Sequence, residues 1–236
     1  MARLPRLDLA GHLYLVIQRE RDAKPAFIDD DDRRRYLAAM LDSSRECGVA
    51  LHAYALMNDH VLMLLTPAEA TSLARFVQAV GRRYVKAFNR RHGRSGALWE
   101  GRYRAAAVEP ASQLMACIRL IEQAPVRAGL ATLASEWPWS SAPHHSGQRL
   151  DAAITEHAAY WQLGNTPFER EARHVRETAA MLTPTEVATL MSAASHGWPH
   201  GSERFLAALA QATDRPVHRR RKGRPAAPAP PSGRNN

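Results

Sequence analysis

The chain contains very few cysteines. Only Cys47 and Cys117 occur among its 236 residues, and they lie far apart with no pairing pattern. A structural zinc site of the common kind would need more thiols, or histidines and cysteines closely spaced in the sequence. We therefore expect two reduced cysteines that pack as small apolar residues, as is typical of a cytoplasmic protein.

Long hydrophobic runs are also missing. The longest ones, such as residues 61–65, have the length of a strand and are too short to span a bilayer. The N-terminus reads MARLPRLDLAGH, which has basic residues but not the uninterrupted apolar segment of a signal peptide. The sequence thus predicts a cytoplasmic protein that does not bind a membrane. If the protein binds DNA, we expect it to be associated with the nucleoid.

Acidic residues are outnumbered by basic ones. The chain has 32 Lys and Arg against 23 Asp and Glu, which gives a formal charge of +9. Such a balance favours a polyanionic partner, most simply a nucleic acid.

The excess of positive charge is concentrated in residues 81–104, GRRYVKAFNRRHGRSGALWEGRYR, where the only acid is Glu100. A solvated helix face usually mixes both signs of charge, whereas a block of one sign with interleaved aromatics is typical of a surface that contacts phosphates and stacks on bases. An ordinary basic surface helix is the alternative. The aromatics are Tyr84, Phe88, Trp99 and Tyr103. The candidate DNA-binding residues of this block are Arg82, Arg83, Lys86, Arg90, Arg91, Arg94, Arg102 and Arg104.

A second basic segment lies near the C-terminus. Residues 214–236 are rich in arginine and then in alanine and proline, a composition that cannot bury a core and predicts a disordered tail. Residues 222–225, KGRP, resemble the core of an AT-hook, which binds the minor groove of A·T-rich DNA, although a nonspecific electrostatic arm is the alternative. The tail adds four candidate DNA-binding residues: Arg220, Arg221, Lys222 and Arg224.

The hydrophobic periodicity predicts alternating strands and helices. Their order, β-α-β-β-α-β followed by a helix, indicates an α+β fold of the ferredoxin-like split βαβ type, with an antiparallel sheet and helices on one face. We expect strands over residues 13–18, 49–56 and 60–66, helices over 33–47, 71–91 and 111–123, and a hairpin or paired strands over 97–108.

The organisation along the chain predicts three parts. Residues 1–145 form the ferredoxin-fold domain, and residues 151–213 form a helical C-terminal region followed by the tail. The helical region is alanine-rich, and we expect three or four short helices that stop at Thr166-Pro167, Thr183-Pro184 and residues 197–199.

Several motifs occur together in one order: HAYALM at 52–57, GRRYV at 81–85, GALWEGRYR at 96–104, PVRAG at 125–129 and WPWSS at 137–141. In this order and spacing the chain resembles the REP-associated tyrosine transposases, single-tyrosine HUH-type relatives of the small insertion-sequence transposases. The resemblance covers about residues 1–145. It implies a ferredoxin-like domain that binds hairpins formed by single-stranded DNA.

The resemblance also implies a chemistry. In active members, two histidines on a central strand and a polar residue on a later helix hold Mg²⁺ or Mn²⁺, which neutralises charge on the scissile phosphate. A tyrosine on that helix attacks the phosphate and forms a covalent phosphotyrosine intermediate, so that the break can be resealed without an energy source.

This sequence departs from the family at those positions. His60 matches the first histidine and is the candidate metal ligand, but Leu62 occupies the position of the second. Leu120 occupies the position of the nucleophilic tyrosine, and Ala124 that of the polar ligand one helical turn later. We therefore expect a DNA-binding protein of transposase descent without catalytic activity and without a cofactor.

Two alternatives stay open. An active strand transferase would need Asp59, His52 or Glu122 to hold Mg²⁺ or Mn²⁺ with His60, and Tyr84 or Tyr103 as nucleophile, although these tyrosines are better interpreted as packing or base-stacking groups. An RNA-binding regulator is the other alternative, because a ferredoxin-like sheet with aromatics also suits single-stranded RNA. The oligomeric state is not predicted.

Overall fold

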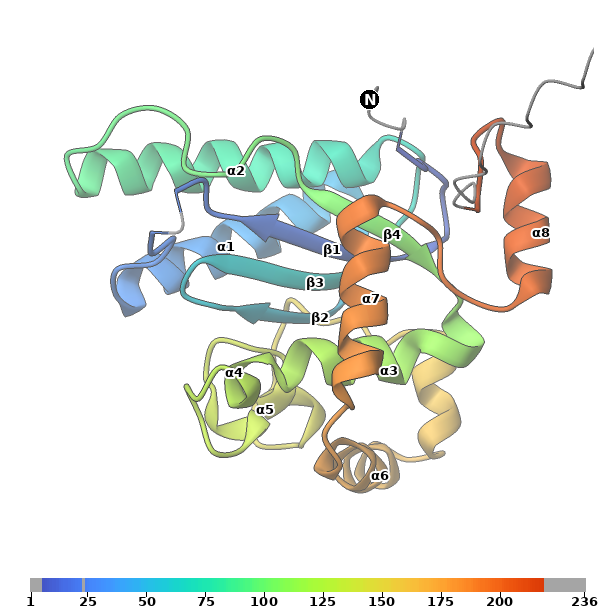
Figure 1. The fold of residues 1–236 in the computed structure, drawn as a ribbon. Coiled ribbons are helices and arrows are strands. Elements are labelled where there is room, and N and C mark those ends of the chain that lie inside the picture. The colour runs from blue at the N-terminus through green and yellow to red at the C-terminus, as the bar shows by residue number, and fades with distance from the viewer. Residues whose placement is uncertain (1–5, 23, 219–236) are drawn as a thin grey trace, which may run out of the picture.

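A four-stranded antiparallel sheet forms the centre of the molecule, as seen in the computed structural model, which describes residues 6–22 and 24–218 (Figure 1). The strand order is β2-β3-β1-β4. This arrangement confirms the predicted α+β split βαβ fold. The strands are β1 (Leu13–Arg19), β2 (Val49–Leu56), β3 (His60–Pro67) and β4 (Arg104–Val108).

The two helices of the split βαβ motif, α1 (Asp30–Cys47) and α2 (Ser72–Arg91), cover one face of the sheet. The Asp29 side chain accepts the backbone N–H of Asp32 and so caps the start of α1. Alternate residues of β1, Tyr14 and Val16, pack with both helices in one buried apolar cluster. This face matches the prediction.

The opposite face of the sheet is covered as well, which the sequence interpretation did not include. Leu13, Leu15 and Ile17 of β1 pack in a second buried cluster with α3 (Pro110–Glu122) and α7 (Pro184–His196). The physical reason is that the central strands are apolar at consecutive positions, so both of their faces need burial.

The C-terminal region consists of short helices, as expected, but the Thr-Pro pairs begin helices and do not merely end them. Thr166 and Thr183 are N-caps, and a proline follows each of them as the first residue of the helix. Each threonine also forms a capping box with a glutamate three residues later. No helix among the described residues is long and apolar enough to cross a membrane. The remaining elements are α4 (Ala124–Arg127), η1 (Ala134–Glu136), α5 (Ala142–His145), η2 (Ala158–Leu163), α6 (Pro167–Ala179) and α8 (Glu203–Ala212).

Residues 97–103 form a loop and not the strand of a hairpin. Only the single bridge between Glu20 and Trp99 continues the pairing beyond β4. Gly96 and Gly101 flank this bridge with φ values of +85° and +58°, in the left-handed region that suits glycine and turns the chain away from the sheet. The loop therefore lies against α2 and is available to form the wall of a cavity.

Arg91 at the end of α2 clamps the start of α1. Its guanidinium donates to Asp29 at 2.6 Å and to the fully buried Asp32 at 2.7 Å, and it lies 3.5 Å from Asp31. The hydrogen bond from Arg91 holds the pKa of Asp29 well below its ordinary value. Burial would raise the pKa of Asp32, but its hydrogen bonds to His92, to the backbone N–H of Ile28 and to Arg91 outweigh that effect and lower it.

We expect Arg91→Ala to lower the unfolding temperature by a few degrees, because it removes the cation that three carboxylates share. The neighbouring Arg90→Ala is the matched control and should leave the unfolding temperature unchanged. Both aspartate pKa values are lowered by folding, so the stabilisation is present above their ordinary value of 3.8 and is lost as the pH falls through the folded-state pKa. Thermal unfolding from neutral to acidic pH should therefore show the Arg91→Ala defect shrinking in acid; a defect independent of pH would contradict the clamp.

Candidate nucleic-acid interface

Four of the eight predicted cations are available to a polyanion. Arg82, Lys86 and Arg90 are exposed and recur every four residues along α2, so they lie along one side of the helix. Arg102 is exposed on the loop that precedes β4. Among residues 6–22 and 24–218, no ion pair involves any of these four side chains.

The other four cations already have acidic neighbours. Arg83 donates to Glu46 at 2.5 Å, Arg104 donates to Glu100 at 3.1 Å, and Arg94 lies 4.0 Å from Glu20. The pairs of Arg83 and Arg104 are solvent-exposed and therefore weak, so that a phosphate can compete for these cations. Arg91 is different, since its three aspartate contacts give it a structural role.

Two of the four interleaved aromatics cannot stack on bases. Tyr84 and Phe88 are 1% and 0% exposed and belong to the apolar cluster between the sheet, α1 and α2. The Tyr84 hydroxyl donates to the carbonyl of Ala26 at 2.5 Å, and burial raises the phenol pKa far above its ordinary value. The base-stacking interpretation and the nucleophile alternative are therefore wrong for Tyr84, because the helical period that exposes the arginines turns both rings inward.

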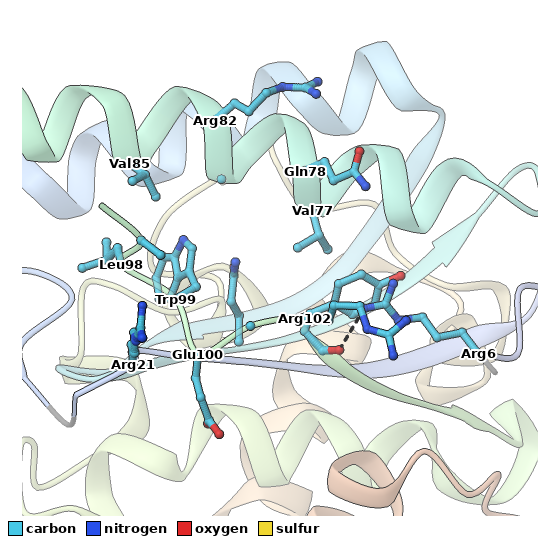
Figure 2. A pocket seen from close by; sticks show the side chains of 15 residues that line it. Arg6, Arg21, Val77, Gln78, Arg82, Val85, Leu98, Trp99, Glu100 and Arg102 are labelled. Carbon is cyan, nitrogen blue, oxygen red and sulfur yellow. Dashed lines mark hydrogen bonds between the residues drawn. The ribbon is translucent and has the colours of Figure 1, made fainter. Parts of the chain in front are cut away.

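Trp99 and Tyr103, the other two aromatics, line a cavity of about 710 Å³ between α2 and the loop. Figure 2 shows Val77 and Val85 of α2 facing Leu98 and Trp99 of the loop across this cavity. The indole N–H of Trp99 and the hydroxyl of Tyr103 have no hydrogen-bond partner within the described part of the chain. The remaining lining residues include Gln18, Gly81 and four arginines: Arg6, Arg21, Arg82 and Arg102.

Arg6 is an example of a flat, delocalised cation that stacks on an aromatic residue of this cavity. Its guanidinium lies 3.8 Å from the centre of the Tyr103 ring and donates to the Tyr103 carbonyl at 3.3 Å (Figure 2). A cavity with apolar walls, aromatic edges and a basic rim has the chemistry to accept a nucleobase with its phosphate.

The positions where the family resemblance implies catalysis lie together on the other side of the sheet. Leu62, Leu120 and Ala124 are 2%, 0% and 7% exposed and belong to one apolar cluster. That cluster also contains Leu190 and Ala194 of α7, which packs on β4 and β1. These side chains offer neither a nucleophile nor a metal ligand, so the residues present do not fit the Mg²⁺ or Mn²⁺ of the active members.

His60 itself is partly buried at the start of β3, where its Nδ1 lies 2.7 Å from Asp59 Oδ1. Burial lowers its pKa although Asp59 acts in the opposite direction. His52 is committed elsewhere: its two ring nitrogens are bonded to the Thr155 carbonyl at 2.7 Å and the Thr66 hydroxyl at 2.9 Å, and burial lowers its pKa to about 4. In the described ranges, no group of three potential metal ligands includes His60.

The sequence analysis named Glu122 as a possible metal ligand beside His60, but it missed the two histidines that lie next to Glu122 in the structure. Glu122 at the end of α3, His145 at the end of α5 and His174 within α6 bring their donor atoms within 4.8 Å of one another. All three are buried, and this group could hold a metal ion. The three residues are distant in sequence and follow no ligand spacing, so only the packing of α5 and α6 against α3 reveals them.

The four predicted cations of the tail, Arg220, Arg221, Lys222 and Arg224, lie outside the described residues, as does most of the predicted disordered segment. They remain predictions.

We expect Leu62→His to destabilise the fold by about 1–3 kcal/mol, because it places an imidazole without a partner in an apolar cluster. Leu62→Met, which conserves volume and apolarity, is the control and should cost less than about 1.5 kcal/mol. Chemical denaturation of both variants measures the difference. Equal stability of the two would show that position 62 faces a polar or hydrated site.

One solved structure agrees with this architecture, and two further comparisons bear on the chain. The chain is similar to a solved REP-associated tyrosine transposase bound to a REP hairpin, with 16% identity, a TM-score of 0.55, and coverage of 67% of this chain and 96% of that one. A putative transposase from Deinococcus radiodurans R1 matches at 22% identity over 50% of this chain and 93% of that one, with a TM-score of 0.36. No curated protein matches. The family described as IS200-like transposase matches residues 8–123, and these residues therefore form a domain of the IS200-like transposase family.

Proposed function

We propose that this protein binds hairpins formed by single-stranded DNA and has lost the strand-transfer chemistry of its family. Family membership supports DNA as the partner. The solved transposase with the same fold is bound to a REP hairpin, which supports a hairpin as the form of that DNA.

The loss of chemistry rests on one observation above the others. Leu62, Leu120 and Ala124 lie in a single buried apolar cluster, in which α3 packs on β2 and β3 and α7 packs on β1 and β4. A strand transferase needs an accessible nucleophile and a charged metal centre, and both are incompatible with a closed apolar interior.

DNA binding rests on the opposite face of the molecule. Arg82, Lys86 and Arg90 form a row on α2 that can follow a phosphate backbone, and Arg102 continues it across the cavity. The cavity between α2 and the loop would hold one unpaired nucleotide. Phosphate contacts supply most of the affinity in this arrangement, so binding must weaken steeply as salt rises.

Each of the three parts of the chain has its own role in this proposal. Residues 1–145 form the DNA-binding domain and residues 151–213 a helical cover for the second sheet face. The basic tail, residues 214–236, adds a tethered second contact with DNA that raises its effective concentration.

Gly81 offers a direct test of the cavity. It lines the cavity, and a Cβ atom added there meets nothing within 4 Å. Gly81→Leu should fill the space and weaken binding of a labelled single-stranded DNA hairpin at least about tenfold, measured by fluorescence anisotropy. Gly81→Ala is the matched control: it should stabilise α2 by about 0.5–1 kcal/mol and leave the affinity nearly unchanged.

Three outcomes of this experiment count against the proposal. Equal affinities of Gly81→Leu and Gly81→Ala would exclude the cavity from the interface. An affinity that is insensitive to salt would contradict phosphate contacts on α2. An RNA hairpin of matched sequence that competes better than the DNA hairpin would favour the RNA-binding alternative.

A further inference from the structure

Glu122, His145 and His174, called the Glu122 cluster below, form an unusual environment for a carboxylate. The Glu122 side chain is 1% exposed, and those of His145 and His174 are each 2% exposed. Glu122 Oε1 lies 2.6 Å from His145 Nδ1, and Oε2 lies 2.9 Å from His174 Nε2. The two imidazole rings stack on each other, with centroids 4.9 Å apart. Three donors from α3, α5 and α6 thus converge from positions far apart in the chain.

The charge of this cluster calls for a cation. Within the described residues, the ion-pair partners of Glu122 are these two histidines and no lysine or arginine. A buried carboxylate needs a compensating positive charge, which one imidazolium of this pair or a bound metal ion can supply. A divalent ion satisfies one carboxylate and two neutral imidazoles at once.

The donor chemistry selects the type of ion. Two imidazole nitrogens and one carboxylate oxygen suit zinc and similar first-row metals, whereas Mg²⁺ and Ca²⁺ prefer oxygen ligands alone. The donor atoms all lie within 4.8 Å of one another, so small movements of the three side chains would bring them to one ion with bonds of about 2.1 Å. The Ser141 hydroxyl donates to Glu122 Oε1 at 2.6 Å and so orients the carboxylate from the second shell.

We propose that Glu122, His145 and His174 bind one zinc ion, which fastens α5 and α6 to α3. All three donors are buried, so the effect of the ion would be on the packing of these helices. Cavities of about 240 Å³ beside His145 and about 190 Å³ beside His174 and Glu122 provide room for a water molecule as the fourth ligand. This site is separate from the family's metal position at His60 and does not depend on the proposed DNA-binding function.

The test uses the full-length protein, purified after expression in zinc-supplemented medium. Elemental analysis should find about one zinc per chain, removal of the ion by a chelator should lower the unfolding temperature, and zinc but not magnesium should restore it. Co²⁺ added to the stripped wild-type protein should give the visible absorption of a tetrahedral site, a readout that requires no variant to fold.

Variants then assign the ligands. His174→Gln should abolish zinc binding and the response of the unfolding temperature to the chelator. Ser141→Ala should keep the site but weaken zinc affinity about 10–100-fold. His144→Gln, which alters the adjacent imidazole without touching the donor set, is the control and should bind zinc like the wild type. A wild-type protein without zinc, whose unfolding temperature responds neither to chelator nor to added zinc, would overturn the proposal and leave a hydrogen-bonded Glu–His–His network.

Discussion

The burial of the sheet on both faces is the constraint on which the rest of this structure depends. Leu13, Leu15 and Ile17 point to one side of the central strand, and Tyr14 and Val16 point to the other. The first set needs α3 and α7 as a cover, and the second needs α1 and α2. Each fully buried leucine or isoleucine contributes about 1.5–3 kcal/mol, so opening the α3 side would be costly. Leu62 and Leu120 belong to that side, so two positions at which the family resemblance implies catalysis contribute here to the stability of the fold.

The α3 side and the α2 side of the sheet consequently differ in the chemistry that they expose. The α3 side is closed by the C-terminal helices, and its polar groups, including Glu122, serve to hold those helices in place. The α2 side keeps an unpaired row of cations and an apolar cavity next to them. A protein that binds DNA without cutting it needs only the second of these faces. Arg91 marks the boundary within the basic block, since it supports the fold while Arg90 beside it is exposed.

The fold was predictable from sequence because its signals are local and repeated. Hydrophobic periodicity and the order of elements led to the split βαβ arrangement, and the motifs led to the family. The content of the second face was harder to predict, because a continuous apolar strand does not say which later helices cover it. The cavity depends on a loop that the composition suggested was a strand, and the inward turn of Tyr84 and Phe88 depends on helix rotation. The Glu122 cluster depends on long-range packing alone, so no spacing in the sequence reveals it.

We propose that the fold and the DNA-binding surface remain in this protein while the strand-transfer chemistry has been lost. To test this most directly, the full-length protein is incubated with a labelled single-stranded DNA hairpin and Mn²⁺, and a native gel is compared with a denaturing SDS gel. If the proposal holds, the native gel shows a salt-sensitive shift, and neither cleavage nor an SDS-resistant adduct is found. A covalent protein–DNA adduct that requires Mn²⁺ would contradict it, because a nucleophile other than the residue at position 120 would then have to reach the phosphate.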